Sequence, residues 1–257
     1  MDGGFSHRIK GHYHTLHGDI GTSLNEIIKQ LKTISCSVPA DIAPPDLNEK
    51  KSKKTIKEGC VDLVAFYKKI DTMWQPHSVG FDDVCMAYKD RQYICQRPNK
   101  NIRFFAATAG SAMGGAFGMG IGAKLADPNL NTFIFSGDGC FRLFGGALAD
   151  VAHLGLRLFI LNNSSYAIVE QGLNYILPDV EKSRYHGSIP TIDFVKIAES
   201  HGWQPYQVNS DLSNLEEIMS ICYSKTKQSI LIDVPVDAKQ EIGINPRVRN
   251  LTAKCYL

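Results

Sequence analysis

Two apolar runs, separated by a glycine-flanked turn and a helical pattern, constrain the fold most strongly. The first run, residues 133–135, ends at Gly137-Asp138-Gly139, and the second, residues 156–161, ends at Asn162-Asn163. A crossover between parallel strands needs about a dozen or more residues, and the interval between the two runs satisfies that. The stretch therefore predicts two parallel strands joined by a helix that opens near Phe141, with the aspartate and the second asparagine at the strands' carboxyl ends.

Side chains at this edge suggest a hard cation that holds a phosphate. Asp138 offers a carboxylate, Asn163 an amide oxygen, and the following loop a backbone carbonyl, which together suit magnesium. Gly137 and Gly139 allow a close backbone approach, and the N–H groups that open the helix suit a diphosphate. A plain Asp-Gly turn with an asparagine cap is the simpler interpretation. The Asn-Asn pair one strand later favours the metal–phosphate hypothesis.

A Gly-Asp-Gly turn followed by an Asn-Asn pair after a helix and a strand resembles the diphosphate- and magnesium-binding motif of thiamine-diphosphate enzymes. The branch that it resembles most is the acetolactate synthase and 2-oxoacid decarboxylase group, although the interval here is a few residues shorter. The resemblance implies an α/β fold, a three-layer doubly wound parallel sheet that binds the diphosphate end of the cofactor. It also implies thiamine diphosphate and Mg²⁺ as cofactors.

The same resemblance assigns roles residue by residue. Met113 falls on the position that props the cofactor into a bent conformation, where its N–H and the carbonyl of Ser111 meet the aminopyrimidine ring; from the residue alone, core filling is the simpler role for this methionine. Tyr166 and Ile168 would cover the cofactor. The implied cofactor-binding residues are Ser111, Met113, Gly137, Asp138, Gly139, Cys140, Asn163, Ser165, Tyr166 and Ile168. The implied metal ligands are Asp138, Asn163 and the backbone carbonyl of Ser165.

Val169 and Gly172 are the implied substrate-pocket residues. Acetolactate synthases carry a tryptophan where this chain has Gly172, so a pocket wider than theirs and a substrate or acceptor bulkier than pyruvate are expected. The catalytic glutamate of pyruvate-type decarboxylases falls where this chain has Val169. Glu170 is one residue late and is not assigned that role.

Two further stretches bear on the site. The glycines of residues 103–126 do not follow the order G-x-G-x-x-G, so a dinucleotide fingerprint fits poorly, and we expect a helix packed very close to its neighbour instead. Asp82 and Asp83 stand where the family holds the terminal phosphate, and they would repel a diphosphate unless they face away.

The organisation along the chain is interpreted in four parts. Residues 1–35 form an appendage that resembles a remnant of a middle domain, with a helix over 23–34 capped by Ser23 and Glu26. Residues 36–54 form a proline- and lysine-rich linker, residues 55–240 the diphosphate-binding domain, whose first helix should begin at Thr55, and residues 241–257 a polar tail.

No stretch resembles the pyrimidine-binding domain, which carries the activating glutamate in the family. The catalytic residue is therefore expected on a partner subunit, in a hetero-oligomer such as a heterotetramer. The leading hypothesis is an acetolactate-synthase-like carboligase subunit that decarboxylates a 2-oxoacid and transfers the acyl carbanion equivalent to a carbonyl acceptor. The alternatives are a simple decarboxylase subunit of the sulfopyruvate or phosphonopyruvate type, and a non-catalytic scaffold or regulatory chain.

Composition sets the remaining expectations. The net charge of +2 argues neither for nor against a polyanionic partner. The lysines of residues 36–54 fit a solvated tether better than a nucleic-acid contact, so no nucleic acid is expected. No apolar leader or membrane-length run occurs. The seven cysteines form no C-x-x-C pair, which is typical of free thiols in a reducing compartment. A cytoplasmic protein without membrane contact is expected.

Overall fold

The computed structural model describes residues 17–34, 55–95, 99–106, 112–177, 179, 181, 187–224, 226–240 and 242. The chain divides into two compact units, Met1–Pro45 and Asp46–Leu257. The division falls within the predicted linker, residues 36–54, which lies outside the described residues. The domain boundaries at 35, 54 and 240 stay predictions. None of the helices in the described ranges has the length and apolarity needed to cross a bilayer.

The described part of the first unit contains helix α1 (Ile20–Leu31), and none of its residues is buried. The predicted start at Ser23 is wrong, because Asp19 caps the helix instead. Its carboxylate accepts hydrogen bonds from the backbone N and the hydroxyl of Thr22, at 2.8 and 3.0 Å. An aspartate in extended conformation satisfies an otherwise unpaired N–H at this position, so the first turn begins at Ile20.

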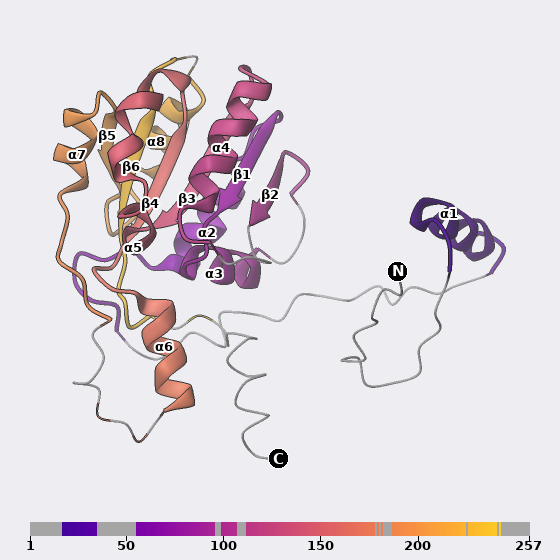
Figure 1. Ribbon diagram of the computed structural model, residues 1–257, viewed down its shortest axis with the longest axis horizontal. Coiled ribbons are helices and arrows are strands. Elements are labelled where there is room, and N and C mark those ends of the chain that lie inside the picture. Colours follow the sequence, from indigo (N-terminus) through magenta and orange to yellow (C-terminus); the bar gives the residue numbers. More distant parts are fainter. Residues whose placement is uncertain are drawn as a thin grey trace. The chain divides into compact units, whose positions relative to one another are not determined.

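In the second unit, six strands form one sheet in the order β2-β1-β3-β4-β6-β5 (Figure 1). Every neighbouring pair is parallel. The strands are β1 (Ser78–Asp82), β2 (Ile102–Ala106), β3 (Asn131–Gly137), β4 (Arg157–Asn162), β5 (Gln204–Gln207) and β6 (Ile230–Pro235). The two strands predicted around the Gly-Asp-Gly turn are β3 and β4, and their parallel pairing confirms the prediction.

Helices cover both faces of this sheet, which confirms the predicted three-layer α/β fold. On β3, Phe133 and Phe135 pack into a core with α2, α3 and α8, while Ile134 packs into a second core with α4, α5 and α7. All three side chains are fully buried, as the period-two alternation of a central strand requires. The helices are α2 (Leu63–Asp71), α3 (Met86–Ile94), α4 (Gly115–Ala126), α5 (Asp138–Phe141), α6 (Ala167–Ile176), α7 (Phe194–Ser200) and α8 (Leu215–Cys222).

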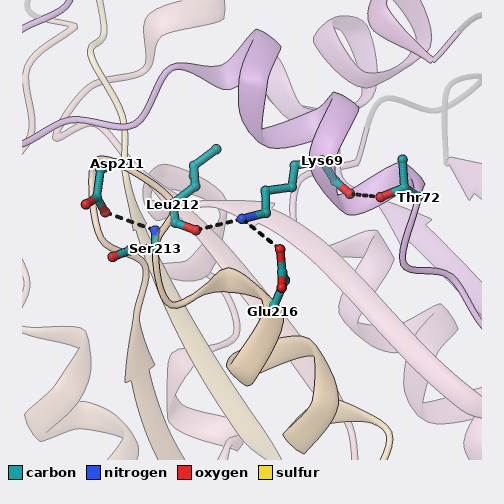
Figure 2. Close-up of polar contacts among 6 residues, drawn as sticks. All are labelled: Lys69, Thr72, Asp211, Leu212, Ser213 and Glu216. Carbon is teal, nitrogen blue, oxygen red and sulfur yellow. Dashed lines mark hydrogen bonds and ion pairs between the residues drawn. The ribbon is translucent and has the colours of Figure 1, made fainter.

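Lys69 links two helices that cover the same face (Figure 2). Its ammonium, on α2, donates to the carbonyl oxygen of Leu212 at 3.1 Å and pairs with Glu216 of α8 at 3.2 Å. Glu216 is largely exposed, so the ion pair contributes little energy. The bond to Leu212 satisfies a carbonyl of the turn that leads into α8.

Two helix predictions are wrong in their details. Helix α2 begins at Leu63 rather than Thr55, because Asp62 caps it by accepting from the backbone N of Val64. The single helix predicted after the Gly-Asp-Gly turn is divided into α5, which begins at Asp138 rather than Phe141, and two 3₁₀ segments, Gly145–Ala147 and Ala149–Leu154. The adjacent Gly145 and Gly146 disfavour a continuous helix.

The glycine-rich stretch forms the close contact that was expected. A Cβ on Gly120 of α4 would lie 2.5 Å from Cδ1 of the fully buried Ile134, whereas a Cβ on Gly118 would meet nothing within 4 Å. Helix α4 therefore packs against β3 through the bare backbone of Gly120.

Gly120→Ala should lower the free energy of unfolding by about 1–2 kcal/mol, because overpacking outweighs the gain in helix propensity. The matched control Gly118→Ala, in the same helix, should raise it by about 0.5–1 kcal/mol. Urea denaturation of the three proteins measures both changes. Equal effects of the two substitutions would contradict the close packing at Gly120.

Candidate active site

The carboxyl ends of β1, β3 and β4 meet at one edge of the sheet. The chain leaves β1 toward β2 on one side, but it leaves β3 toward β4 on the other. The order therefore switches direction between β1 and β3, which is where ligands bind in open α/β sheets.

A cavity of ≈ 330 Å³ opens at this switch point. It is formed by the ends of β3 and β4, by the segments that follow β1, β3 and β4, and by Met113, two residues before the start of α4. Its described lining residues are Val84, Cys85, Met86, Met113, Gly137, Asp138, Gly139, Cys140, Leu161, Asn163, Ser165, Tyr166, Ala167, Ile168 and Val169. A site of this size fits part of a small cofactor.

Asp138 is the most unusual polar group in the cavity. Its side chain is 3 % exposed, and Oδ1 has no hydrogen-bond partner among the described residues. Burial raises the pKa of Asp138 to about 6, although the backbone N–H groups of Ser164 and Asn163 act in the opposite direction. A buried carboxylate with an unsatisfied oxygen is costly unless a cation completes it.

The loop after β4 is held in one shape by its own hydrogen bonds. Asn163 Oδ1 accepts from the backbone N of Ser165 at 2.9 Å, and the Ser165 hydroxyl donates to Glu170 at 3.0 Å. Between them, Ser164 adopts a left-handed conformation with φ of 53°. An amide oxygen has a second lone pair, so Asn163 keeps the capacity to bind a cation.

Residues that follow α6 in the chain hold this loop in place through backbone hydrogen bonds. The backbone N of Tyr166 donates to the carbonyl of Gly187 at 2.7 Å, and the N of Ile189 donates to the carbonyl of Ser164 at 2.9 Å. These bonds form a short antiparallel bridge between Ser165 and Ser188. The carbonyls and amides on the cavity side of the loop are thereby set in fixed positions.

At the two glycines of the turn, a side chain would come too close to a neighbouring residue. A Cβ on Gly139 would lie 2.6 Å from the ring of Tyr166, and one on Gly137 would lie 3.1 Å from Cβ of Cys85. Both neighbours therefore pack directly on the backbone of the turn. This close packing requires glycine at position 139, and at position 137 a Cβ would fit only if Cys85 shifted by a few tenths of an ångström.

Most of the residues singled out from the sequence lie together around the cavity: Met113, Gly137, Asp138, Gly139, Cys140, Asn163, Ser165, Tyr166, Ile168 and Val169. Ser111 lies outside the described residues. Gly172 is buried within α6 and is not among the lining residues. Sequence reasoning missed Val84, Cys85 and Met86, although their place directly after a strand that ends beside β3 is a usable signal.

The residues present fit a hard divalent cation and a diphosphate. The oxygen donors are a carboxylate, an amide and a backbone carbonyl, the set that magnesium-like ions accept. Within the described ranges, no group of three His, Cys, Asp or Glu side chains could hold a metal, which disfavours a zinc-type site. None of the described lining residues is Lys, Arg or His, so a phosphate here would depend on N–H groups and on a cation.

Residues 85–234 match the model of the thiamine pyrophosphate enzyme C-terminal TPP binding domain. The chain belongs to this family. The match covers more than half of the chain and includes the segments after β3 and β4 that line the cavity. It confirms the resemblance inferred from the Gly-Asp-Gly and Asn-Asn motifs, and it identifies thiamine diphosphate as the cofactor of the family's fold.

Several curated proteins are similar over the same region. A 3D-(3,5/4)-trihydroxycyclohexane-1,2-dione hydrolase from Geobacillus thermodenitrificans is 27 % identical over 161 residues, covering 57 % of this chain and 24 % of the relative. The acetolactate synthase large subunit of Buchnera aphidicola is 27 % identical over 154 residues, covering 58 % and 26 %. A probable acetolactate synthase large subunit from Methanocaldococcus jannaschii is 29 % identical over 156 residues, covering 60 % and 26 %. The chain thus spans about a quarter of the length of the relatives it matches.

The stability of the protein without divalent cations should depend on Asp138. The folded chain holds this proton with a pKa of about 6 against an ordinary 3.8, so stability falls as the pH rises through that interval. Asp138→Asn removes the charge, and at pH 7.5 it should be more stable than the wild type by up to about 3 kcal/mol. At pH 4 the two proteins should be nearly equal.

Urea denaturation at both pH values, with a chelator present, measures these differences. Added Mg²⁺ should stabilise the wild type and leave Asp138→Asn unchanged. A variant that is less stable than the wild type at pH 7.5 would show that the carboxylate is satisfied within the protein.

Proposed function

We propose that the chain is a subunit of a thiamine-diphosphate-dependent, acetolactate-synthase-like carboligase. The observation that carries the proposal is the buried Asp138, with its unpartnered oxygen, in a cavity that also contains Asn163 and Ser165. The Mg²⁺ ion is proposed to bind Asp138, Asn163 and the Ser165 carbonyl, and to hold the diphosphate. Membership in the thiamine pyrophosphate enzyme family supports the choice of cofactor.

When bound, the cofactor supplies an electron sink for the carbon that loses CO₂. In the proposed reaction, the bond from a 2-oxoacid's carbonyl carbon to its carboxylate breaks and CO₂ leaves. The same carbon then bonds to the carbonyl carbon of an acceptor, whose oxygen takes a proton. The residues of this chain would bind and orient the cofactor: Met113 would support it, and Tyr166 and Ile168 would cover it.

Apolar lining residues support carboligation over decarboxylation of an acidic 2-oxoacid. Val84, Met86, Leu161, Ile168 and Val169 contribute aliphatic surface, and the described lining contains no cation. A second anionic group on the substrate, as in a sulfonate or phosphonate, would be left without a counter-charge from the described lining residues. An uncharged acyl group suits this lining better.

The activating glutamate is proposed to come from a partner chain with a pyrimidine-binding domain. The curated relatives have about three quarters of their length outside the matched region, which gives them room for other domains. Among the described residues between 55 and 242, one parallel sheet accounts for all the strands. The proposed active site therefore lies between this subunit and its partner.

A product assay on the chain purified with its partner tests this function. Each 2-oxoacid is supplied with and without a carbonyl acceptor, and both CO₂ and products are measured. We expect CO₂ release coupled to a new C–C bond. The sequence-based expectation of an acceptor bulkier than pyruvate rested on Gly172, which is not among the described lining residues. Asp138→Ala should lower turnover to background.

The other outcomes distinguish the alternatives. CO₂ release that ignores the acceptor would indicate a simple decarboxylase, and hydrolysis of a cyclic 1,2-dione would favour the activity for which the Geobacillus relative is named. No turnover by the complex, or full turnover by Asp138→Ala, would contradict the proposal. A preference for pyruvate with 2-oxobutyrate would contradict the bulky-acceptor expectation alone.

A further inference from the structure

We propose that Asp83 is a positioning residue for the cofactor cavity, which it controls by fixing the Met113–Gly114 peptide against the end of β3. This inference rests on the proposed function, in which Met113 supports the cofactor. It gives a role to the second of two adjacent aspartates whose closeness to a diphosphate was unexplained from the sequence.

Asp83 directly follows β1 and is 1 % exposed. Both of its carboxylate oxygens lie 3.0 Å from the backbone N of Gly114. The hydroxyl of Ser136, on β3, donates to Oδ2 at 2.8 Å, and the backbone N of Val84 donates to Oδ1 at 2.9 Å. The Asp83 carboxylate thus links three segments: the segment before α4, the end of β3 and the segment after β1.

The hydrogen bond from Gly114 to Asp83 also constrains Met113, because Met113 and Gly114 share one peptide plane. The N–H of Gly114 belongs to the same rigid unit as the carbonyl of Met113, so the carboxylate fixes how that peptide is turned. Gly114 is also the N-cap of α4, with a φ of 80° and no capping side chain of its own. Asp83 accepts from the backbone N–H of this N-cap residue and places a carboxylate near the positive end of the helix.

Met113 itself is 37 % exposed and lines the cavity. Unlike a core methionine, it is not held in place by packing on all sides. The position of its side chain therefore depends on the backbone that carries it, and that backbone is held by Asp83.

Asp82 provides a matched control, because it is adjacent and equally buried but contacts a different region. Its Oδ2 accepts from Nε of Arg91 at 2.6 Å, and Arg91 in turn lies over the ring of Phe104. Neither aspartate is among the lining residues of the cavity. Comparing substitutions of Asp82 and Asp83 therefore separates the general effect of losing a buried carboxylate from a specific effect on the cavity.

The test compares Asp83→Asn and Asp82→Asn in chains labelled with ¹³C at the methionine methyl groups. Met113→Leu assigns the Met113 methyl signal. Asp83→Asn should shift that signal in the free protein and weaken binding of thiamine diphosphate with Mg²⁺ about tenfold, the effect of losing one charge-assisted hydrogen bond. Asp82→Asn should lower the unfolding midpoint while the Met113 signal and the affinity stay as in the wild type.

Two results would overturn the inference: an unchanged Met113 signal in Asp83→Asn, or the same shift and affinity loss in Asp82→Asn. If Asp83→Asn does not fold, Ser136→Ala decides in its place, since it removes one donor to the same carboxylate; a shifted Met113 signal supports the inference, and an unshifted one overturns it. Failure of the proposed function is visible separately in the product assay, while the methyl signal of the free protein still tests Asp83.

Discussion

The parallel pairing of β3 with β1 on one side and β4 on the other is the constraint on which the site depends. The registers set Asp82 beside Phe135 and Gly137 beside Leu161, so the segments that leave these strands all begin at one edge. A slip of one residue would turn the phenylalanines of β3 from one core to the other. The same burial that fixes the register therefore fixes the distance between the Gly-Asp-Gly turn and the asparagine loop.

Two buried carboxylates at this edge differ in whether the protein itself satisfies their oxygens with hydrogen bonds. Asp83 accepts bonds from Gly114, Ser136 and Val84, and is satisfied within the protein. Asp138 keeps one oxygen without a partner among the described residues, and burial raises its pKa to about 6. The first arrangement stabilises a shape. The second is unfavourable in the protein alone, a local cost that natural proteins accept at functional sites, and the proposed Mg²⁺ would offset it.

Much of this could be read from the sequence, because the strongest signals were local. The apolar runs, the glycines of the turn and the Asn-Asn pair predicted parallel strands with Asp138 and Asn163 at one edge. The predictions that failed involved either residues that compete for one role or contacts between residues far apart in the sequence. Asp19 outcompetes Ser23 as the cap of α1, and paired glycines divide the helix after β3. The role of Asp83 depends on Gly114, thirty-one positions away, and no local pattern indicates that contact.

The Gly-Asp-Gly and Asn-Asn edge is proposed to bind thiamine diphosphate through a divalent cation. Mn²⁺ can replace Mg²⁺ as a paramagnetic probe, and electron–nuclear double resonance then detects phosphorus nuclei bound near the metal. With saturating thiamine diphosphate, the wild type should show ³¹P couplings to protein-bound Mn²⁺, and Asp138→Asn should show none. Equal couplings in both proteins, or cofactor binding that needs no metal, would contradict the account.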